Sequence, residues 1–130
     1  MTTDQRPLIL VVEADAEQRK ALCRALFQSG YDTLAATSGA AAIAMLAQHR
    51  PTIALVLLNP QLPDMSGEDT CRYLFKRHPG LRCLIYSDTH DAALIERLLK
   101  TGPSAYLTKT GDLAVLTEKI RALLSGPSRP

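Results

Sequence analysis

Five short apolar runs recur along the chain, and each has the pattern of a buried β-strand. They are continuous rather than alternating, and glycine or proline residues lie between several of them. A run that is apolar on both faces is typical of a strand inside a sheet that is covered on both sides. The expected strands span residues 8–12, 33–36, 53–58, 81–86 and 105–108.

The segments between and after these runs carry apolar residues at helical spacing. Gly30 is expected to end the first helix, and Ser38, Asp91 and Asp112 are expected to cap the start of three others. The expected helices span residues 16–29, 38–48, 68–77, 91–100 and 112–124. Strands that alternate with amphipathic helices predict an α/β domain with a parallel, doubly wound sheet.

Polar residues follow four of the five expected strands. Glu13 and Asp15 follow the first strand, Asn59 follows the third, Ser87 follows the fourth, and Lys109 follows the fifth. In an open parallel sheet the binding site lies beyond the carboxyl ends of the strands, so these residues are expected to converge. Carboxylates suit Mg²⁺, whereas a hydroxyl and a lysine suit a phosphoryl group.

Composition narrows the class of protein. A length of 130 residues suits one domain, and a net charge of +2 supplies no basic stripe for nucleic acid. No apolar stretch approaches the roughly 18 residues that span a bilayer, and the N-terminus lacks an apolar leader, so a cytoplasmic location is expected. The three cysteines are scattered and are expected to be small apolar side chains rather than metal ligands.

Four spaced motifs together resemble the receiver domain of two-component response regulators. They are LILVVEADAEQR, LVLLNPQLPDMSG, CLIYSD and SAYLTK, which occur in the order that this family shows. The resemblance implies a single-domain flavodoxin-like (βα)5 sandwich with strand order 2-1-3-4-5. It places the domain at residues 8–124, with a short extension at 1–7 and a tail or linker start at 125–130.

The resemblance also implies roles for the residues at the strand ends. In receivers a phosphohistidine of a sensor kinase donates phosphate to an aspartate at the position of Asn59. Mg²⁺ is held by acids after the first strand and by a backbone carbonyl at the position of Gln61. Ser87 and Lys109 match the residues that hold the phosphoryl oxygens, and Tyr106 matches the aromatic switch residue.

The chain departs from the family pattern at two central positions. Asn59 replaces the phosphate-accepting aspartate, and Ala14 replaces an acid that usually binds the metal. Glu13 and Asp15 flank that gap, but successive residues project differently, so Asp15 is not expected to substitute. Two independent losses predict a degenerate, non-enzymatic pseudo-receiver with weak or absent Mg²⁺ binding and no other cofactor.

The remaining site residues also have plain structural explanations. Lys109 is expected to pair with Glu13 and to neutralise a buried charge without a metal. Ser87 is expected to bond the backbone of its own loop. Tyr106 fits either a half-buried strand tyrosine or a switch that rotates between buried and exposed positions.

An apolar stripe on the fourth helix suggests where a partner binds. Leu94 and Leu98 form one row of side chains, and Ile95 and Leu99 form another. With Tyr106 and with Val115, which falls outside the core face of the last helix, they are candidates for an interface of helix four, strand five and helix five. The stripe is equally compatible with an ordinary core face. The expected partners are a sensor kinase, an output domain or a second copy, with neither nucleic acid nor membrane.

Two other functions remain open at this point. One is a phosphorelay receiver in which Asn59 is a variant of an accepting aspartate. The other is a small enzyme or nucleotide-binding protein, but the first turn, EADAE, lacks a glycine-rich loop and would repel phosphate.

Overall fold

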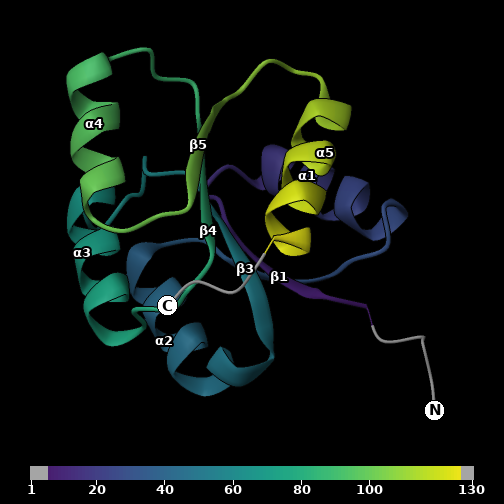
Figure 1. Ribbon diagram of the computed structural model, residues 1–130, viewed down its shortest axis with the longest axis horizontal. Coiled ribbons are helices and arrows are strands. Elements are labelled where there is room, and N and C mark those ends of the chain that lie inside the picture. Colours follow the sequence, from purple (N-terminus) through teal and green to yellow (C-terminus); the bar gives the residue numbers. More distant parts are fainter. Residues whose placement is uncertain (1–5, 127–130) are drawn as a thin grey trace.

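Five parallel strands form the centre of the protein, as a computed structural model that describes residues 6–126 shows (Figure 1). They lie in the order β2-β1-β3-β4-β5. This confirms the α/β class and the strand order that the resemblance implied. The strands are β1 (Leu8–Val12), β2 (Asp32–Ala36), β3 (Ile53–Leu58), β4 (Cys83–Ser87) and β5 (Ala105–Thr108).

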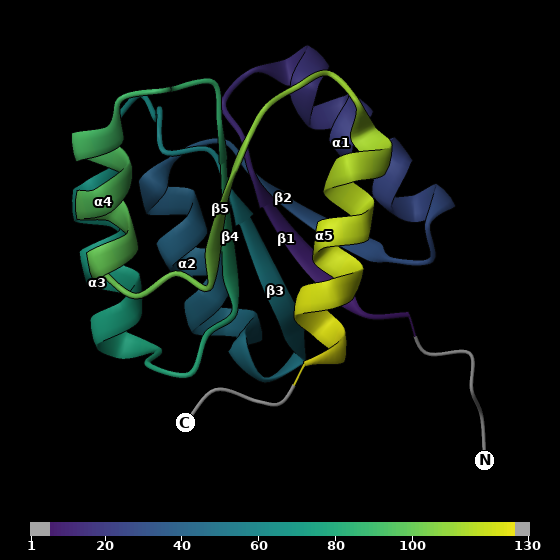
Figure 2. The same ribbon diagram turned by 45° about the horizontal axis from the view of Figure 1, so that its top comes forward.

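Helices cover both faces of this sheet. In Figure 2 the α1 and α5 helices lie on one face and α2, α3 and α4 on the other. The helices are α1 (Ala16–Gln28), α2 (Gly39–His49), α3 (Gly67–Arg77), α4 (Ala92–Lys100) and α5 (Leu113–Ser125), with a short 3₁₀ turn η1 (Arg50–Thr52) before β3. The sheet therefore separates two cores, as expected for a doubly wound fold.

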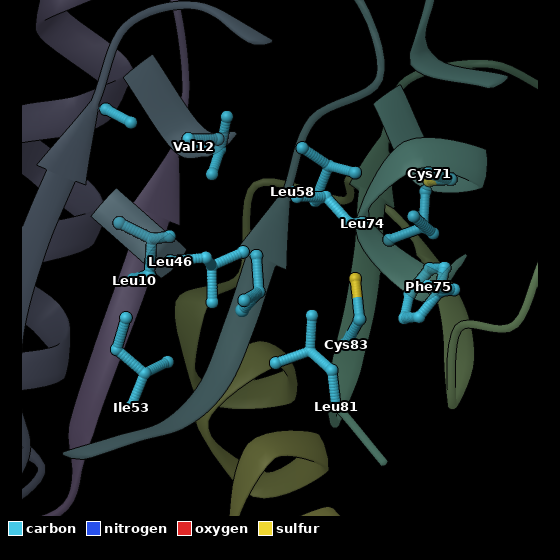
Figure 3. Close-up of a cluster of buried hydrophobic side chains, with 14 of the residues drawn as sticks. Leu10, Val12, Leu46, Ile53, Leu58, Cys71, Leu74, Phe75, Leu81 and Cys83 are labelled. Carbon is cyan, nitrogen blue, oxygen red and sulfur yellow. The ribbon is translucent and has the colours of Figure 1, made fainter. Parts of the chain in front are cut away.

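Alternate residues of the central strands serve the two cores. Ile9 and Val11 pack with α1 and α5, whereas Leu10 and Val12 pack with α2 and its neighbours. This follows from the two-residue period of a strand. Figure 3 shows the core on the side of α2, α3 and α4, where Leu46, Leu74 and Phe75 from the helices meet side chains of the strands.

The predicted helix caps are confirmed. Ser38, Asp91 and Asp112 each accept a backbone N–H in the first turn of the helix that follows. The fourth strand begins later than predicted, at Cys83 rather than Leu81. The reason is a turn, because the Leu81 N–H donates to the carbonyl of His78 at 3.0 Å and is not free to pair with a strand.

The predicted division of the chain is only partly within the described residues. The last helix runs to Ser125, one residue beyond its expected end. Residues 1–5 of the expected extension and 127–130 of the expected tail lie outside the described part. Cys23, Cys71 and Cys83 form no disulfide bond among the described residues, and Cys71 and Cys83 are buried. Within residues 6–126 no helix is long and apolar enough to cross a bilayer.

Asp64 fastens the loop after β3 to the start of α2. Its carboxylate accepts the N–H groups of Gly39 and Ala40 at 2.8 and 2.9 Å. These are N-terminal helix donors that would otherwise lack partners, and the helix dipole favours an anion there. The backbone N–H bonds, led by that of Ala40, lower the pKa of Asp64.

Asp64→Ala is expected to lower the melting temperature more at neutral pH than in acid. A folded-state pKa below the unfolded value means that the ionised carboxylate stabilises the fold above the unfolded pKa. This stabilisation is lost as the pH falls through the folded pKa. Melting curves of the parent chain and of Asp64→Ala from about pH 7 to about pH 3 test this, because carboxyl groups titrate toward the lower end of that range. A gap that stays constant with pH would show that the carboxylate does not act through its charge.

Candidate functional site

The carboxyl ends of β1 and β5 bring together a buried ion pair. Glu13 follows β1 and is only 2% exposed, and Lys109 follows β5 with a side chain that is 9% exposed. The Lys109 Nζ lies 2.9 Å from Glu13 Oε1. The pairing predicted from the sequence is therefore confirmed, and the lysine neutralises a carboxylate that is almost wholly removed from water.

Asn59, which follows β3, is a hydrogen-bond donor to the same carboxylate. Its Nδ2 donates to both oxygens of Glu13, at 3.0 and 3.2 Å. Its Oδ1 accepts the N–H of Gln61 at 3.0 Å, which fixes the orientation of the amide. An aspartate has no hydrogen to donate at neutral pH, so the amide turns a contact that would be repulsive into an attractive one.

Backbone groups complete the surroundings of Glu13. The N–H of Asp15 donates to Oε2 at 3.0 Å, so each carboxylate oxygen accepts two hydrogen bonds. The guanidinium of Arg19 in turn donates to the carbonyls of Glu13 and Ala14, at 3.0 and 3.3 Å. The carboxylate is thus charge-balanced and fully bonded by this chain alone.

The donor set does not fit the magnesium site of the family. Asp15 is exposed and caps α1, where its carboxylate accepts the N–H of Glu17 and the amide of Gln18. Ala14 offers no side-chain oxygen, and Asn59 presents N–H groups toward Glu13 rather than an oxygen. Within residues 6–126 no cluster of three or more acidic, histidine or cysteine side chains is placed to hold a metal.

The two expected switch residues meet at one loop residue, Thr89. Ser87 is fully buried, and its Oγ accepts the N–H of Thr89 at 3.2 Å, which is the local loop bond predicted from the sequence. Tyr106 on β5 is half-buried, and its hydroxyl donates to the carbonyl of Thr89 at 2.9 Å. Burial raises the pKa of Tyr106, so this hydroxyl stays protonated and keeps the β4–α4 loop attached to β5.

Two contacts of Lys109 were not anticipated from the sequence. Its Nζ donates to Oε1 of Gln18, and it lies 5.5 Å from the centre of the Tyr86 ring. Gln18 lies one helical turn beyond Asp15 on α1, a spacing that places both at the same end of the helix. The position of Gln18 near Asp15 therefore indicates from the sequence that Gln18 lies at the same strand ends as Lys109. No feature of the sequence links Tyr86 to Lys109.

The candidate interface is smaller than the sequence suggested. Leu98 is fully buried in the core, so it is removed from the candidate surface, and Leu94 and Ile95 are half-buried. Leu99 and Val115 remain, 40% and 44% exposed. Val115 also lines a shallow, almost wholly apolar groove on α5 and β5, with Leu107, Ala114 and Ala122.

Comparisons with known proteins agree with the fold. The family model described as "Response regulator receiver domain" matches residues 9–121. The probable transcriptional regulatory protein TcrX of Mycobacterium tuberculosis is 33% identical over 124 residues, which are 93% of this chain and 51% of TcrX. The response regulator MprA of Mycobacterium leprae is 34% identical over 116 residues, covering 89% of this chain and 50% of MprA. The chain thus spans about half the length of these relatives.

Solved structures show the same fold at lower identity. A chain of the CheX–CheY–BeF3–Mg complex from Borrelia burgdorferi matches with a TM-score of 0.86 at 20% identity, over 92% of this chain and 90% of that one. A CheY-like receiver domain protein from Methanospirillum hungatei matches with a TM-score of 0.84 at 24% identity, over 92% and 94% of the two chains.

Proposed function

The chain belongs to the response regulator receiver domain family, and we propose that within two-component signalling it acts as a pseudo-receiver. Such a module transmits information by protein–protein contact and is not phosphorylated by a sensor kinase. The family supplies the signalling context, and the altered site supplies the reason to exclude phosphate as the input.

The observation that carries this proposal is the satisfied carboxylate of Glu13. Lys109, Asn59 and the N–H of Asp15 together occupy its oxygens. A phosphate-accepting site needs an uncommitted carboxylate to attack phosphorus and an excess of negative charge to bind the metal. Here an amide stands at the accepting position and Lys109 balances the charge of Glu13, so both requirements fail.

The proposed interaction surface lies over α4, β5 and α5. Leu99 and Val115 are exposed there, and the groove beside Val115 is apolar. Glu118 and Lys119 border that groove, so the patch carries both an acid and a base, which suits a self-complementary two-fold interface. A second copy of this chain is therefore the proposed occupant, and an output domain or another partner is the alternative.

Size exclusion with light scattering tests the assembly, run with and without Mg²⁺ and beryllofluoride, a mimic of the phosphoryl group. We expect the mass of a dimer under both conditions. The mass of a monomer under both conditions would contradict the dimer and would favour a different protein as the partner. A mass that changes when the mimic is added would contradict the loss of phosphoryl sensing.

Val115→Glu is expected to convert the dimer into a monomer. A glutamate in the apolar groove would bury an unpaired charge, which costs about 3 kcal/mol and weakens association more than a hundredfold. Light scattering gives the mass directly. Phe27→Glu is the matched control, because Phe27 is 61% exposed on α1, away from the proposed surface. A dimer that survives the change at Val115, or one that dissociates with the change at Phe27, would contradict this surface.

A further inference from the structure

A hollow separate from the proposed interface lies between α1 and the loop that joins β5 to α5. Its volume is about 480 Å³, within the usual size range of small-molecule sites. Leu22 and Leu113 contribute apolar wall, and the ring of Tyr86 lines it as well. Lys109 and Gln18 close it on the side of Glu13. The hollow therefore combines apolar walls with a few polar groups, which is the usual composition of a ligand site.

The hydroxyl of Tyr86 is left unpaired in this hollow. The residue is only 5% exposed, yet among the described residues no hydrogen bond to its hydroxyl is found. Within residues 6–126, no fully enclosed side-chain oxygen or nitrogen lacks a partner, so this hydroxyl must reach open space in the hollow. Burial, followed by the carboxylates of Asp88 and Asp112, raises the pKa of Tyr86. The group is thus a neutral hydroxyl that is free to accept a hydrogen bond.

The charges at the hollow favour a cation. Lys109 and Asp88 are the charged residues of its lining, and Glu13 neutralises the lysine at 2.9 Å. Asp88 is exposed, and in the described part of the chain its carboxylate makes no ion pair. The uncompensated charge at this site is therefore the negative charge of Asp88, which lies two positions after Tyr86 in the sequence.

We propose that this hollow binds a small organic cation, an amidinium, guanidinium or amine carried on an apolar or aromatic body. The cation would pair with Asp88 and donate to the hydroxyl of Tyr86, while its body would pack on Leu22, Leu113 and the tyrosine ring. Two sources share this chemistry, namely a free molecule and an arginine side chain of a partner protein. The proposal does not depend on the loss of phosphorylation.

The test is an NMR titration of the full chain with benzamidine, with neutral benzamide and with anionic benzoate. Benzamidine is expected to cause saturable shifts of the backbone N–H signals of Tyr86, Thr110 and Gly111. Benzamide is expected to bind about tenfold more weakly, and benzoate not at all, because neither supplies the charge for Asp88. Equal binding of the three probes, or no shift at these residues, would overturn the proposal.

Two variants separate the contacts of the cation from the shape of the hollow. Tyr86→Phe and Asp88→Asn are each expected to weaken benzamidine binding by about tenfold. Since the tyrosine hydroxyl has no partner among the described residues, Tyr86→Phe should leave the melting temperature unchanged, which shows that the fold is intact. Unchanged benzamidine affinity in both variants would also refute the site.

A capped arginine, N-acetyl-arginine amide, distinguishes the two sources. Tighter binding of benzamidine than of the capped arginine supports a free aromatic cation as the natural ligand. Tighter binding of the capped arginine supports a partner's side chain. Failure of both to shift the signals of the hollow would contradict the proposed chemistry.

Discussion

Lys109→Met is expected to destabilise the protein by about 3–5 kcal/mol, the usual loss when one partner of a buried ion pair is removed. Methionine keeps much of the length of the side chain but removes the charge. Glu13, whose side chain is 3% exposed, would then lose the charge of its lysine partner and keep neutral donors around it. Urea unfolding, followed by circular dichroism, measures the difference in the free energy of unfolding.

An exposed ion pair provides the matched control for this change. Arg72 on α3 pairs with Asp69 at 3.8 Å and with Glu68 at 2.5 Å, away from the proposed interface, and the side chains of Arg72 and Asp69 are 63% and 68% exposed. Arg72→Met is therefore expected to cost less than about 1 kcal/mol, since solvent screens such pairs. Adding Glu13→Gln to Lys109→Met should recover part of the lost stability, because it removes the unpaired charge. A cost at Lys109 no greater than that at Arg72 would contradict the role of the buried ion pair.

Asn59→Asp is expected to destabilise the protein by about 2–4 kcal/mol when no divalent cation is present. The change removes two hydrogen bonds to the Glu13 carboxylate, at 3.0 and 3.2 Å, and substitutes a second negative charge at the same distance. A hydrogen-bonding contact to a charged group contributes about 1.5–3 kcal/mol, both distances belong to the one Nδ2 group, and two carboxylates in contact resist joint ionisation. Urea unfolding in the presence of a chelator measures this loss.

Magnesium is expected to separate this variant from the parent chain. A cation that binds the folded state stabilises it by mass action. Millimolar Mg²⁺ should therefore restore part of the stability of Asn59→Asp and more of that of the double variant Ala14→Asp/Asn59→Asp, while the parent chain should not respond. A parent chain that gains stability with Mg²⁺ would show that its own residues bind the cation. Phosphorylation of Asn59→Asp by a small phosphate donor would favour the alternative in which Asn59 is a variant of an accepting receiver.

Local chemistry accounts for what the sequence predicted correctly. Continuous apolar runs mark buried parallel strands because both of their faces are covered, and Ser38, Asp91 and Asp112 mark helix starts because their side chains bond orphan N–H groups. The pairing of Lys109 with Glu13 was also predictable. Glu13 directly follows an apolar strand and Lys109 follows another, and a carboxylate placed that close to the core requires a partner for its charge.

Features that depend on the exact placement of elements were beyond the sequence. The stripe of α4 contains two apolar rows, and periodicity cannot tell which one faces the sheet, so Leu98 is an interface candidate by its sequence although it is buried in the structure. The donor role of Asn59 depends on which end of its amide faces Glu13, and that is set by the backbone N–H of Gln61. The hollow beside Tyr86 depends on the spacing between α1 and the β5–α5 loop, which no local pattern encodes.

An NMR titration of the unaltered chain with Mg²⁺ and beryllofluoride tests the pseudo-receiver function directly. We expect no saturable shift in the N–H signals of Ser87, Tyr106 and Lys109, because Asn59 supplies no carboxylate for the mimic and Lys109 is held by Glu13. Saturable, Mg²⁺-dependent shifts at these three residues would show that the site still senses a phosphoryl group and would contradict the pseudo-receiver function.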